Sequence, residues 1–227
     1  LGYFAKRHPE IVRSIATAGH EIASHGFNHH LVYQLRPDEF REDVSSTKSL
    51  LEDLTGSVVR GYRAPNFSIT ERAPWAHEIL VETGHVYDSS VYPVWHPRYA
   101  NLDKPREITD IETPAGPLTV VPLSAASVSL FGRTLRLPAA GGAYWRLFPR
   151  SLIGHLLARV SEGDGLPLCC YFHPWELDPG QPRVAELPML TRLRHYGGIS
   201  SFDRRVEYFL RRFPFSTVWE VIQSRTG

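Results

Sequence analysis

Residues 58–88, VVRGYRAPNFSITERAPWAHEILVETGHVYD, contain the pattern that decides the fold. An apolar stretch at 58–63 predicts a strand, Thr70 is a candidate cap for a helix that runs to about Glu82, and residues 85–87 predict a second strand. A strand, a helix and a strand in this order are typical of a sheet with parallel strands. We therefore expect an α/β fold.

The same alternation of helices and strands continues on either side of this stretch. Periodicity and end signals predict helices at 9–18, 37–55, 151–160 and 202–213, and strands at 20–24, 108–113, 118–123 and 166–172. The last of these runs is continuously apolar, which predicts a strand buried on both faces. Residues 92–143 are rich in Pro and Gly and predict an excursion from the α/β core.

Composition places the chain among globular proteins with a sizeable core. It has 227 residues, of which 42% are hydrophobic and 22% charged, and a net charge of +1. Such a balanced charge provides no general attraction to nucleic acid or to anionic membranes. The cysteines Cys169 and Cys170 are adjacent, which excludes a disulfide framework, and no apolar run approaches the roughly 20 residues of a membrane span.

Polar residues repeatedly follow the predicted strands. His25 and His29 follow the strand at 20–24, Arg63 and Asp88 follow the two strands of the opening stretch, and His173 ends the last apolar run. In parallel α/β folds, functional sites lie at the carboxyl ends of the strands. We therefore expect these side chains to contribute to a functional site.

Each of these residues also has an ordinary structural interpretation. On a helical turn, the spacing of His25 and His29 places both imidazoles on one face, where they either bind one metal ion or are solvated. Arg63 either holds a carboxylate or lies in a surface turn stiffened by Pro65. Asp88 either caps a turn or orients a histidine.

The stretch Tyr171-Phe172-His173-Pro174-Trp175-Glu176 is the most informative segment. A histidine at the end of a strand is usually structural, but here a proline fixes it and Trp175 offers an aromatic surface suited to a sugar ring. In that setting His173 is a candidate general acid.

Together these segments resemble the NodB-type polysaccharide deacetylases of carbohydrate esterase family 4. Residues 24–29 resemble the family's metal-binding histidine motif, 63–65 its arginine–proline motif, 88–89 its aspartate motif and 171–173 its final histidine motif. A narrower branch of the family, the exosortase-associated deacetylases of exopolysaccharide loci, is resembled by the residues at 61–69 and 172–176. The C-terminal extension of that branch is resembled by residues 194–197 and the arginine-rich helix that follows.

The resemblance implies an irregular (β/α) barrel in a single polysaccharide deacetylase domain over residues 1–227. Residues 1–175 are expected to form a partial barrel with the excursion at 92–143, and residues 176–227 an extension packed on it. An aspartate motif at the end of a first strand is expected in this family, and none precedes His25. We therefore expect the chain to begin after the first strand–helix–strand region.

The resemblance also implies a role for each motif. His25 and His29 would hold a divalent metal, usually zinc, and Arg63 would hold the catalytic aspartate that is absent from this chain. A backbone N–H near Asn66 would help to stabilise an oxyanion. His173 would protonate the leaving amine, Asp88 would orient His173, and Trp175 would contact the sugar.

The implied reaction is hydrolysis of N-acetyl groups from amino sugars of a bacterial exopolysaccharide or oligosaccharide, with release of acetate. Because the base and one metal ligand are absent, we expect weak metal binding and little turnover. Three alternatives stay open: a non-catalytic sugar-binding or assembly module with stacking platforms at Trp95, Trp145 and Trp175, a hydrolase of another C–N bond such as a cyclic ureide, and an α/β domain whose histidines are merely scattered.

Overall fold

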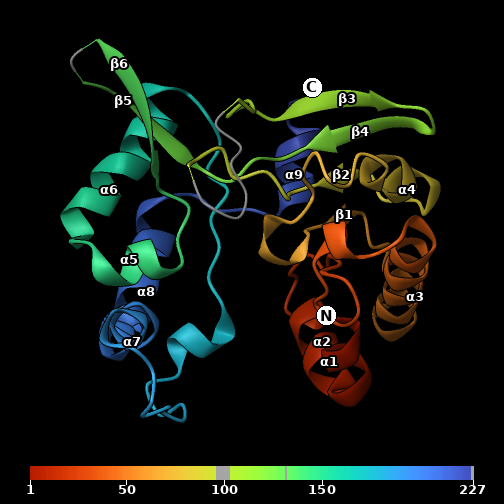
Figure 1. The fold of residues 1–227 in the computed structure, drawn as a ribbon, viewed down its shortest axis with the longest axis horizontal. Coiled ribbons are helices and arrows are strands. Elements are labelled where there is room, and N and C mark those ends of the chain that lie inside the picture. The colour runs from red at the N-terminus through yellow and green to blue at the C-terminus, as the bar shows by residue number, and fades with distance from the viewer. Residues whose placement is uncertain (96–102, 131, 226–227) are drawn as a thin grey trace. The chain divides into compact units, whose positions relative to one another are not determined.

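The computed structural model describes residues 1–95, 103–130 and 132–225, and they form a mixed α/β fold (Figure 1). Contacts divide the chain into two compact units. The first unit comprises Leu1–Pro122 with Thr217–Gly227, and the second comprises Leu123–Ser216. The division falls inside the excursion expected at 92–143, of which residues 96–102 and 131 lie outside the described part. The single domain stays a prediction.

A mixed sheet of four strands forms the centre of the first unit, in the order β1-β2-β4-β3. Its strands are β1 (Gly61–Tyr62), β2 (Tyr87–Asp88), β3 (Thr109–Thr113) and β4 (Gly116–Val120). β1, β2 and β4 pair in parallel, whereas β3 and β4 form an antiparallel hairpin. On the other side of β1, Ser24 forms an isolated parallel bridge with Tyr62. The parallel strands therefore align their carboxyl ends, as the opening stretch predicts.

Helices accompany this sheet (Figure 1). The described helices of the first unit are α1 (Gly2–Arg7), α2 (Pro9–Thr17), α3 (Pro37–Thr55), α4 (Ala76–Glu82) and α9 (Val218–Gln223), with short 3-10 turns η1 (Val32–Gln34) and η2 (Pro65–Phe67). α3 agrees closely with its sequence signals: Pro37 occupies the first turn, where the missing N–H costs nothing, and Gly56 ends the helix with a left-handed φ of 66°.

The apolar stripe of α3 joins two clusters of buried side chains. Phe40 and Val44 pack in the cluster that contains Tyr62 of β1, and Leu51 packs in a second cluster that contains Val12 of α2. Full burial of each such side chain contributes about 1.5–3 kcal/mol. α3 thereby fixes β1, whose end carries Arg63, against the rest of the first unit.

The last helix is tied to the first unit by one carboxylate. Glu21 accepts a hydrogen bond of 2.8 Å from the hydroxyl of Tyr87 and one of 2.9 Å from the backbone N–H of Trp219 in α9. The guanidinium of Arg60 lies 4.9 Å from the ring centroid of Trp219. These contacts explain why the chain returns to the first unit after residue 216.

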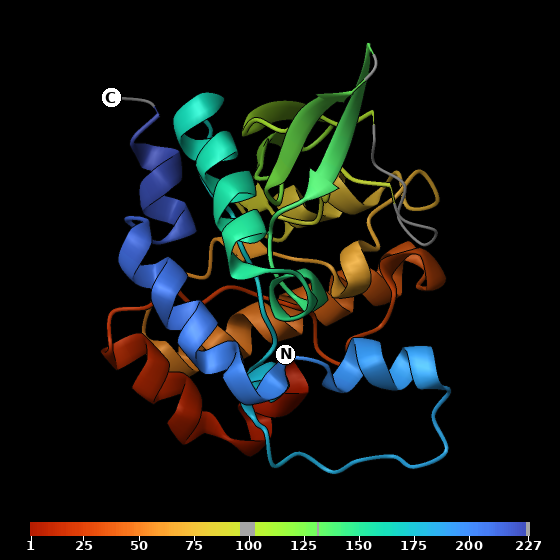
Figure 2. The ribbon, with the colours of Figure 1, turned by 90° about the vertical axis from the view of Figure 1, so that its left-hand side faces the viewer.

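The second unit combines a hairpin with helices (Figure 2). Its described elements are β5 (Ala125–Leu130), β6 (Arg133–Pro138), α5 (Ala143–Leu147), α6 (Arg150–Ala158), the π-helical turn η3 (Arg159–Gly163), η4 (Pro174–Leu177), α7 (Met189–Tyr196), η5 (Ile199–Ser201) and α8 (Phe202–Arg212). Trp145, Ile153 and Phe209 belong to its buried cluster, and the rings of Trp145 and Phe209 lie 4.7 Å apart. This unit therefore has a core of its own.

Two predicted strands are wrong in extent or in kind. Of residues 20–24, only Ser24 pairs with a neighbour, and residues 166–172 form no regular strand. In the latter stretch, Tyr171 makes an isolated bridge with Gly141, and most of its apolar side chains are only half buried. Apolar runs this short do not specify pairing, which depends on the neighbouring segment.

Two further local predictions need correction. The helix expected from Thr70 begins at Ala76, because Pro74 disfavours helical backbone at Ala73 and the segment before α4 forms turns instead. The β5–β6 hairpin was not predicted, since Arg and Ser interrupt the apolar pattern of its strands.

No helix in the described ranges combines the length and the apolar character needed to cross a membrane.

His85 is a buried titratable group in the first unit. It is 3% exposed, its Nδ1 lies 3.0 Å from Thr83 Oγ1, and no partner is found for its Nε2 among the described residues. Burial and, secondarily, the charge of Lys48 lower the pKa of His85 to about 4. The folded protein therefore holds this imidazole neutral at pH values where an unfolded chain protonates it.

This shift predicts a stability loss in acid. Between pH 6.5 and 4 the unfolded state binds the proton of His85 and the folded state does not, so stability falls as the pH falls. We expect His85→Phe to remove about 2 kcal/mol of the stability difference between pH 7 and pH 5. Urea unfolding at both pH values measures this. The exposed His20→Phe is the control, and an equal pH dependence in both variants would contradict the assignment.

Candidate functional site

Three predicted residues lie at neighbouring strand ends in the first unit. His25 follows the bridge at Ser24, Arg63 follows β1, and Asp88 ends β2. The backbone N–H of Arg63 donates to the carbonyl of Ser24 at 2.9 Å, and that of Ser89 donates to Tyr62 at 2.9 Å. The sheet pairing therefore gathers these residues at one edge, as the sequence predicts.

The two histidines are neighbours, although not on a helix. The segment that carries His25 and His29 is irregular, and His29 has a left-handed φ of 62°. The one-face arrangement considered for a helical turn therefore does not apply, because Gly26 and His29 both adopt positive φ values that no helix contains. The rings nonetheless meet edge to face with centroids 5.1 Å apart.

His25 is arranged as a metal ligand would be. Its Nδ1–H donates to the backbone carbonyl of Arg63 at 2.6 Å, which leaves the lone pair of Nε2 available. Burial lowers the pKa of His25 to about 4, a shift that the Arg63 carbonyl partly opposes and His29 reinforces. A neutral imidazole is the form that binds metals.

The pair fits a divalent metal as part of its ligand set. His25 and His29 supply two neighbouring imidazole donors, a type that suits zinc and related ions. Within the described ranges, no group of three or more His, Cys, Asp or Glu side chains is placed to hold a metal ion. The histidines therefore account for two donors.

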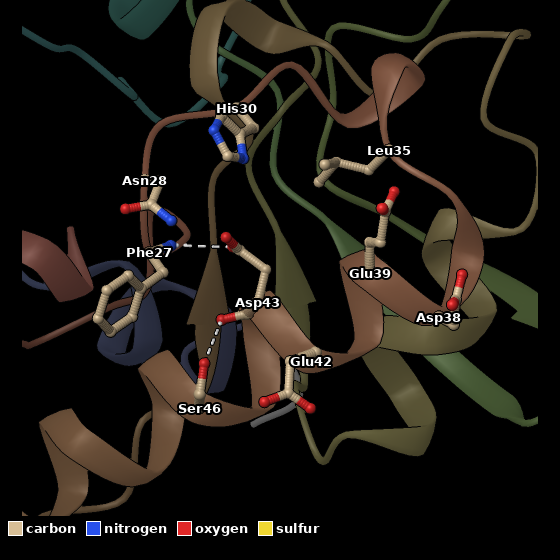
Figure 3. Close-up of a pocket in the computed structure, with 9 residues that line it drawn as sticks. All are labelled: Phe27, Asn28, His30, Leu35, Asp38, Glu39, Glu42, Asp43 and Ser46. Atoms are coloured by element: carbon tan, nitrogen blue, oxygen red, sulfur yellow. Dashed lines mark hydrogen bonds between the residues drawn. The ribbon is translucent and has the colours of Figure 1, made fainter.

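Asp43 of α3 supports the loop that carries the histidines (Figure 3). Its Oδ2 accepts a hydrogen bond of 2.9 Å from the backbone N–H of Phe27. Burial raises the pKa of Asp43, and the N–H groups of Phe27 and Asn28 partly offset that effect. Gly26 passes so close to this carboxylate that a Cβ at this position would lie 2.7 Å from Oδ2.

A groove lies beside this loop (Figure 3). It is lined by Phe27, Asn28, His30, Leu35, Asp38, Glu39, Glu42, Asp43 and Ser46. Four of these side chains are acidic and come from the N-terminal half of α3. Asp38 and Glu39 lie in the first turn, where carboxylates interact favourably with the helix dipole. The helix therefore explains the placement of these two carboxylates, whereas Asp43 supports the histidine loop.

Arg63 and Asp88 are both held by serines of the β2 end. Arg63 donates from Nε to the carbonyl of Ser89 at 3.0 Å and from Nη2 to its hydroxyl at 2.8 Å. Asp88 is fully buried, accepts a hydrogen bond from the hydroxyl of Ser90, and lies 3.2 Å from Nε2 of His77. The guanidinium is therefore fixed rather than loose, as the functional interpretation requires.

The loop after β1 carries unusual backbone geometry. Asn66 and Phe67 have φ values of 51° and 55°, and among the described non-glycine residues only His29 joins them at positive φ. Such conformations cost of order 1 kcal/mol or more each and occur preferentially at functional sites. The histidine loop and the loop at Asn66 therefore share this strained backbone conformation.

The second unit contains His173 and Trp175. Glu176, three residues after His173, lies with its Oε2 3.1 Å from the histidine Nδ1. The Trp175 ring stacks on His173 at 5.5 Å and on His195 at 4.5 Å between centroids. The ring of Trp175, which the sequence predicts to contact sugar, is therefore stacked on two histidines of the same unit.

Trp145 and Trp95, the other two tryptophans considered as sugar-stacking platforms, differ in their exposure. Trp145 is 2% exposed and donates from Nε1 to the carbonyl of Ala139, so it belongs to the core of the second unit. Trp95 is 69% exposed.

Sequence reasoning missed several residues that hold the predicted ones. Asp43 and His77 contact the histidine loop and Asp88, and Glu176 contacts His173. Glu176 had a readable signal, because proline followed two positions later by glutamate is typical of a helix start whose third residue caps the preceding N–H. The pairing of Asp88 with His173 stays a prediction, since the two belong to different units.

Comparison with known families agrees with the motif order. Residues 1–87 match the model of the family described as Polysaccharide deacetylase. Residues 89–223 match the family described as Domain of unknown function (DUF3473). The chain belongs to the family described as Domain of unknown function (DUF3473), whose match spans more than half of it, and its first 87 residues match the polysaccharide deacetylase model. The region that matches DUF3473 includes the whole of the second unit.

Curated relatives align with part of the chain. A peptidoglycan-N-acetylglucosamine deacetylase of Bacillus cereus is 34% identical over 79 residues, which cover 34% of this chain and 29% of the relative. A peptidoglycan deacetylase of Helicobacter pylori is 28% identical over 90 residues, covering 40% and 30%. The chain thus spans less than a third of the length of these relatives.

Solved structures confirm the α/β fold of the deacetylase type. A candidate polysaccharide deacetylase of Mycobacterium smegmatis has a TM-score of 0.56 at 22% identity, covering 96% of this chain and 72% of the other. Puue allantoinase has a TM-score of 0.59 at 18% identity, covering 96% and 63%. At these identities the likeness is one of fold.

The contact between Gly26 and Asp43 yields a stability prediction. Gly19 and Gly26 both have positive φ, but only at Gly26 would an added Cβ meet another atom. We expect Gly19→Ala to cost about 1 kcal/mol for its backbone strain and Gly26→Ala at least about 1 kcal/mol more. Urea unfolding measures both.

A double-mutant cycle tests the cause of that difference. In an Asp43→Ala background the carboxylate is gone, so the additional cost of Gly26→Ala should shrink. An unchanged additional cost would show that the Asp43 contact does not explain it.

Proposed function

We propose that this chain provides the catalytic groups of a divalent-metal-dependent deacetylase that hydrolyses N-acetyl groups of amino sugars in a bacterial polysaccharide. The main support is the cluster of His25, Arg63 and Asp88 at adjoining strand ends, with His25 Nδ1 fixed by the carbonyl of Arg63. The names of the curated relatives support an N-acetylated sugar polymer as the substrate class.

In this proposal His25 and His29 hold the metal. Burial keeps His25 neutral, and its bond to the Arg63 carbonyl presents Nε2 to the ion. When bound, such an ion supplies Lewis-acid polarisation of the acetamide carbonyl and activation of a water molecule. To bind this ion the chain must hold two imidazoles close together, and the edge-to-face contact of His25 and His29 supports this.

Three further groups of the first unit would bind negative charge or hold the loop after β1. Arg63, fixed by Ser89, presents its guanidinium to a carboxylate at the strand ends. Asn66, the exposed residue of a mostly buried loop, offers a backbone N–H to the oxygen on which charge develops. Asp88 acts through Ser90, whose hydroxyl accepts the backbone N–H of Ala64 at 2.8 Å and thereby anchors the loop after β1.

His173 is proposed as the general acid. Water forms the new C–O bond to the acetyl carbon and gives its proton to the carboxylate that Arg63 would hold. As the C–N bond of the acetamide breaks, the sugar nitrogen takes a proton from the imidazole and leaves as an amine, and the acetyl group is released as acetate. Its side chain is 50% exposed, so the ring is accessible to a substrate.

Acetate release tests the proposal directly. The protein is stripped with a chelator, reloaded with Zn²⁺ and incubated with N-acetylated chito-oligosaccharides, peptidoglycan fragments and an acetylated bacterial exopolysaccharide. We expect zinc-dependent acetate release from at least one of them, at a low rate because the expected aspartate base is absent and the described residues offer two metal donors. His25→Ala, His29→Ala and His173→Ala should each lower the rate about 100-fold or more.

Matched controls separate catalysis from folding. His20→Ala in the first unit and His155→Ala in the second replace exposed histidines that contact none of the proposed groups, and both should keep the full rate. Sugar binding without acetate release by the folded, zinc-loaded protein would favour a non-catalytic module. Hydrolysis of allantoin in place of the acetylated sugars would favour a ureide hydrolase.

A further inference from the structure

The second unit contains a buried ion pair that the proposed reaction does not use directly. Arg146 of α5 and Glu176 of η4 have side chains that are 2% and 1% exposed, and Arg146 Nε donates to Glu176 Oε1 at 2.7 Å. Removing two charges from water is costly, so a pair of this kind needs further partners for its remaining donors and acceptors. The identity of those partners indicates what the pair does.

The second oxygen of Glu176 is directed to His173. Oε2 accepts the backbone N–H of His173 at 2.8 Å and lies 3.1 Å from its ring Nδ1. Burial alone would raise the pKa of Glu176, but the hydrogen bonds from His173 and Arg146 outweigh burial and lower that pKa. Glu176 is thus held as a carboxylate, which accepts a proton from Nδ1–H in a hydrogen bond and so assigns the imidazole tautomer.

Arg146 is itself fixed by the end of α7. Nη1 donates to the carbonyls of His195 and Gly197 at 2.9 and 2.7 Å, and Nη2 donates to that of Arg194 at 3.0 Å. These carbonyls at the C-terminus of the helix carry partial negative charge that a guanidinium neutralises. The planar fork of Arg146 therefore cannot turn away from Glu176 without losing bonds at both ends.

The imidazole held in this way keeps one nitrogen available. His173 is half exposed although Glu176 is buried, so the carboxylate lies beneath the ring and Nε2 is the nitrogen that a substrate can reach. Trp175 stacks on His173 at an interplanar angle of 21°, which further restricts the ring. A donor with a fixed ring and a defined tautomer is what general-acid catalysis requires.

Capping of η4 alone does not explain the arrangement. Two other glutamates occupy the same third position of a helix and accept the N–H of the preceding residue: Glu39 at 2.8 Å in α3 and Glu220 at 3.2 Å in α9. Glu220 is exposed, the side chain of Glu39 is 42% exposed, and neither is paired with a buried arginine. The cap needs only the backbone contact, whereas Glu176 also receives a buried cation and an imidazole.

We propose that Glu176, held by Arg146, is the positioning residue of His173, and that the region matching the domain of unknown function thereby assembles its own general-acid dyad. This inference rests on the proposed function for the catalytic role of His173. It assigns to residues 146–197 the task of fixing the ring and presenting Nε2 as the proton donor, so Glu176 takes the orienting role that the family resemblance implied for Asp88.

Nitrogen-15 NMR of the histidine rings tests the positioning without any turnover. At pH 9, where imidazoles are neutral, the ring of His173 in the unaltered protein is expected to carry its proton on Nδ1. A proton on Nε2 would overturn the proposal without recourse to any variant. His173→Asn identifies the signal by its disappearance.

The matched variant removes both charges together. Arg146→Met with Glu176→Leu avoids leaving one buried charge unpaired, a replacement that proteins often tolerate. In this double variant the Nδ1–H form should lose its dominance, whereas Glu220→Leu, which removes a cap of the same kind, should leave the signal of His173 unchanged. An unchanged tautomer in the double variant would overturn the proposal.

Kinetics then separate the positioning role from the proposed function. In a protein that releases acetate, the double variant should lower kcat at least about tenfold with little change in KM, because the proton transfer is affected and sugar binding is not. A normal kcat with an altered tautomer would overturn the catalytic part of the proposal. If the unaltered protein releases no acetate, the proposed function fails, and the NMR result alone decides whether Glu176 positions His173.

Discussion

The parallel hydrogen bonding that joins Ser24 to β1 and β1 to β2 is the constraint on which the first unit's site depends. These contacts are short, only one or two residues on each segment, yet they fix where each following loop begins. Because all of them run in one direction, the side chains that follow leave the sheet at one edge. The packing of α3 on Tyr62 keeps this narrow pairing in register.

In each unit the Nδ1 of one proposed functional histidine is held by a hydrogen-bond acceptor, but the two acceptors differ in charge. The acceptor is the neutral backbone carbonyl of Arg63 for His25 and the carboxylate of Glu176 for His173. A carbonyl fixes the tautomer without adding charge, which suits an imidazole that is to donate a lone pair. A carboxylate also stabilises a positive ring, which suits an imidazole that is to carry and release a proton. The choice of acceptor thus matches the chemistry proposed for each ring.

Much of the fold could be predicted from local signals. α3 and α8 were predicted almost to the residue, because Pro37 and Gly56 delimit the former and the periodic aromatic residues mark the latter. The strands were predicted less well, since only two residues of 58–63 pair and 166–172 is not a strand at all. A helix is specified by its own residues, whereas a strand of two residues is specified by its neighbours.

The same distinction applies to the site. The order of the motifs predicts His25, His29 and Arg63 as site residues, and the structure places His25 beside His29 and the carbonyl of Arg63. Their supports were not predictable, since Asp43 and Arg146 reach the site from helices distant in sequence. Spacing within one segment carries no information about such partners.

The left-handed backbone of His29 has an evolutionary consequence. Asparagine and aspartate tolerate this conformation at least as well as histidine does, whereas β-branched residues do not. Asparagine and aspartate are therefore the substitutions that would preserve the loop while changing the side-chain donor from an imidazole to an amide or a carboxylate. Replacing the proposed ligand His29 by asparagine or aspartate would therefore change the metal donor with little penalty to folding, so the identity of this ligand and the stability of the fold can vary separately.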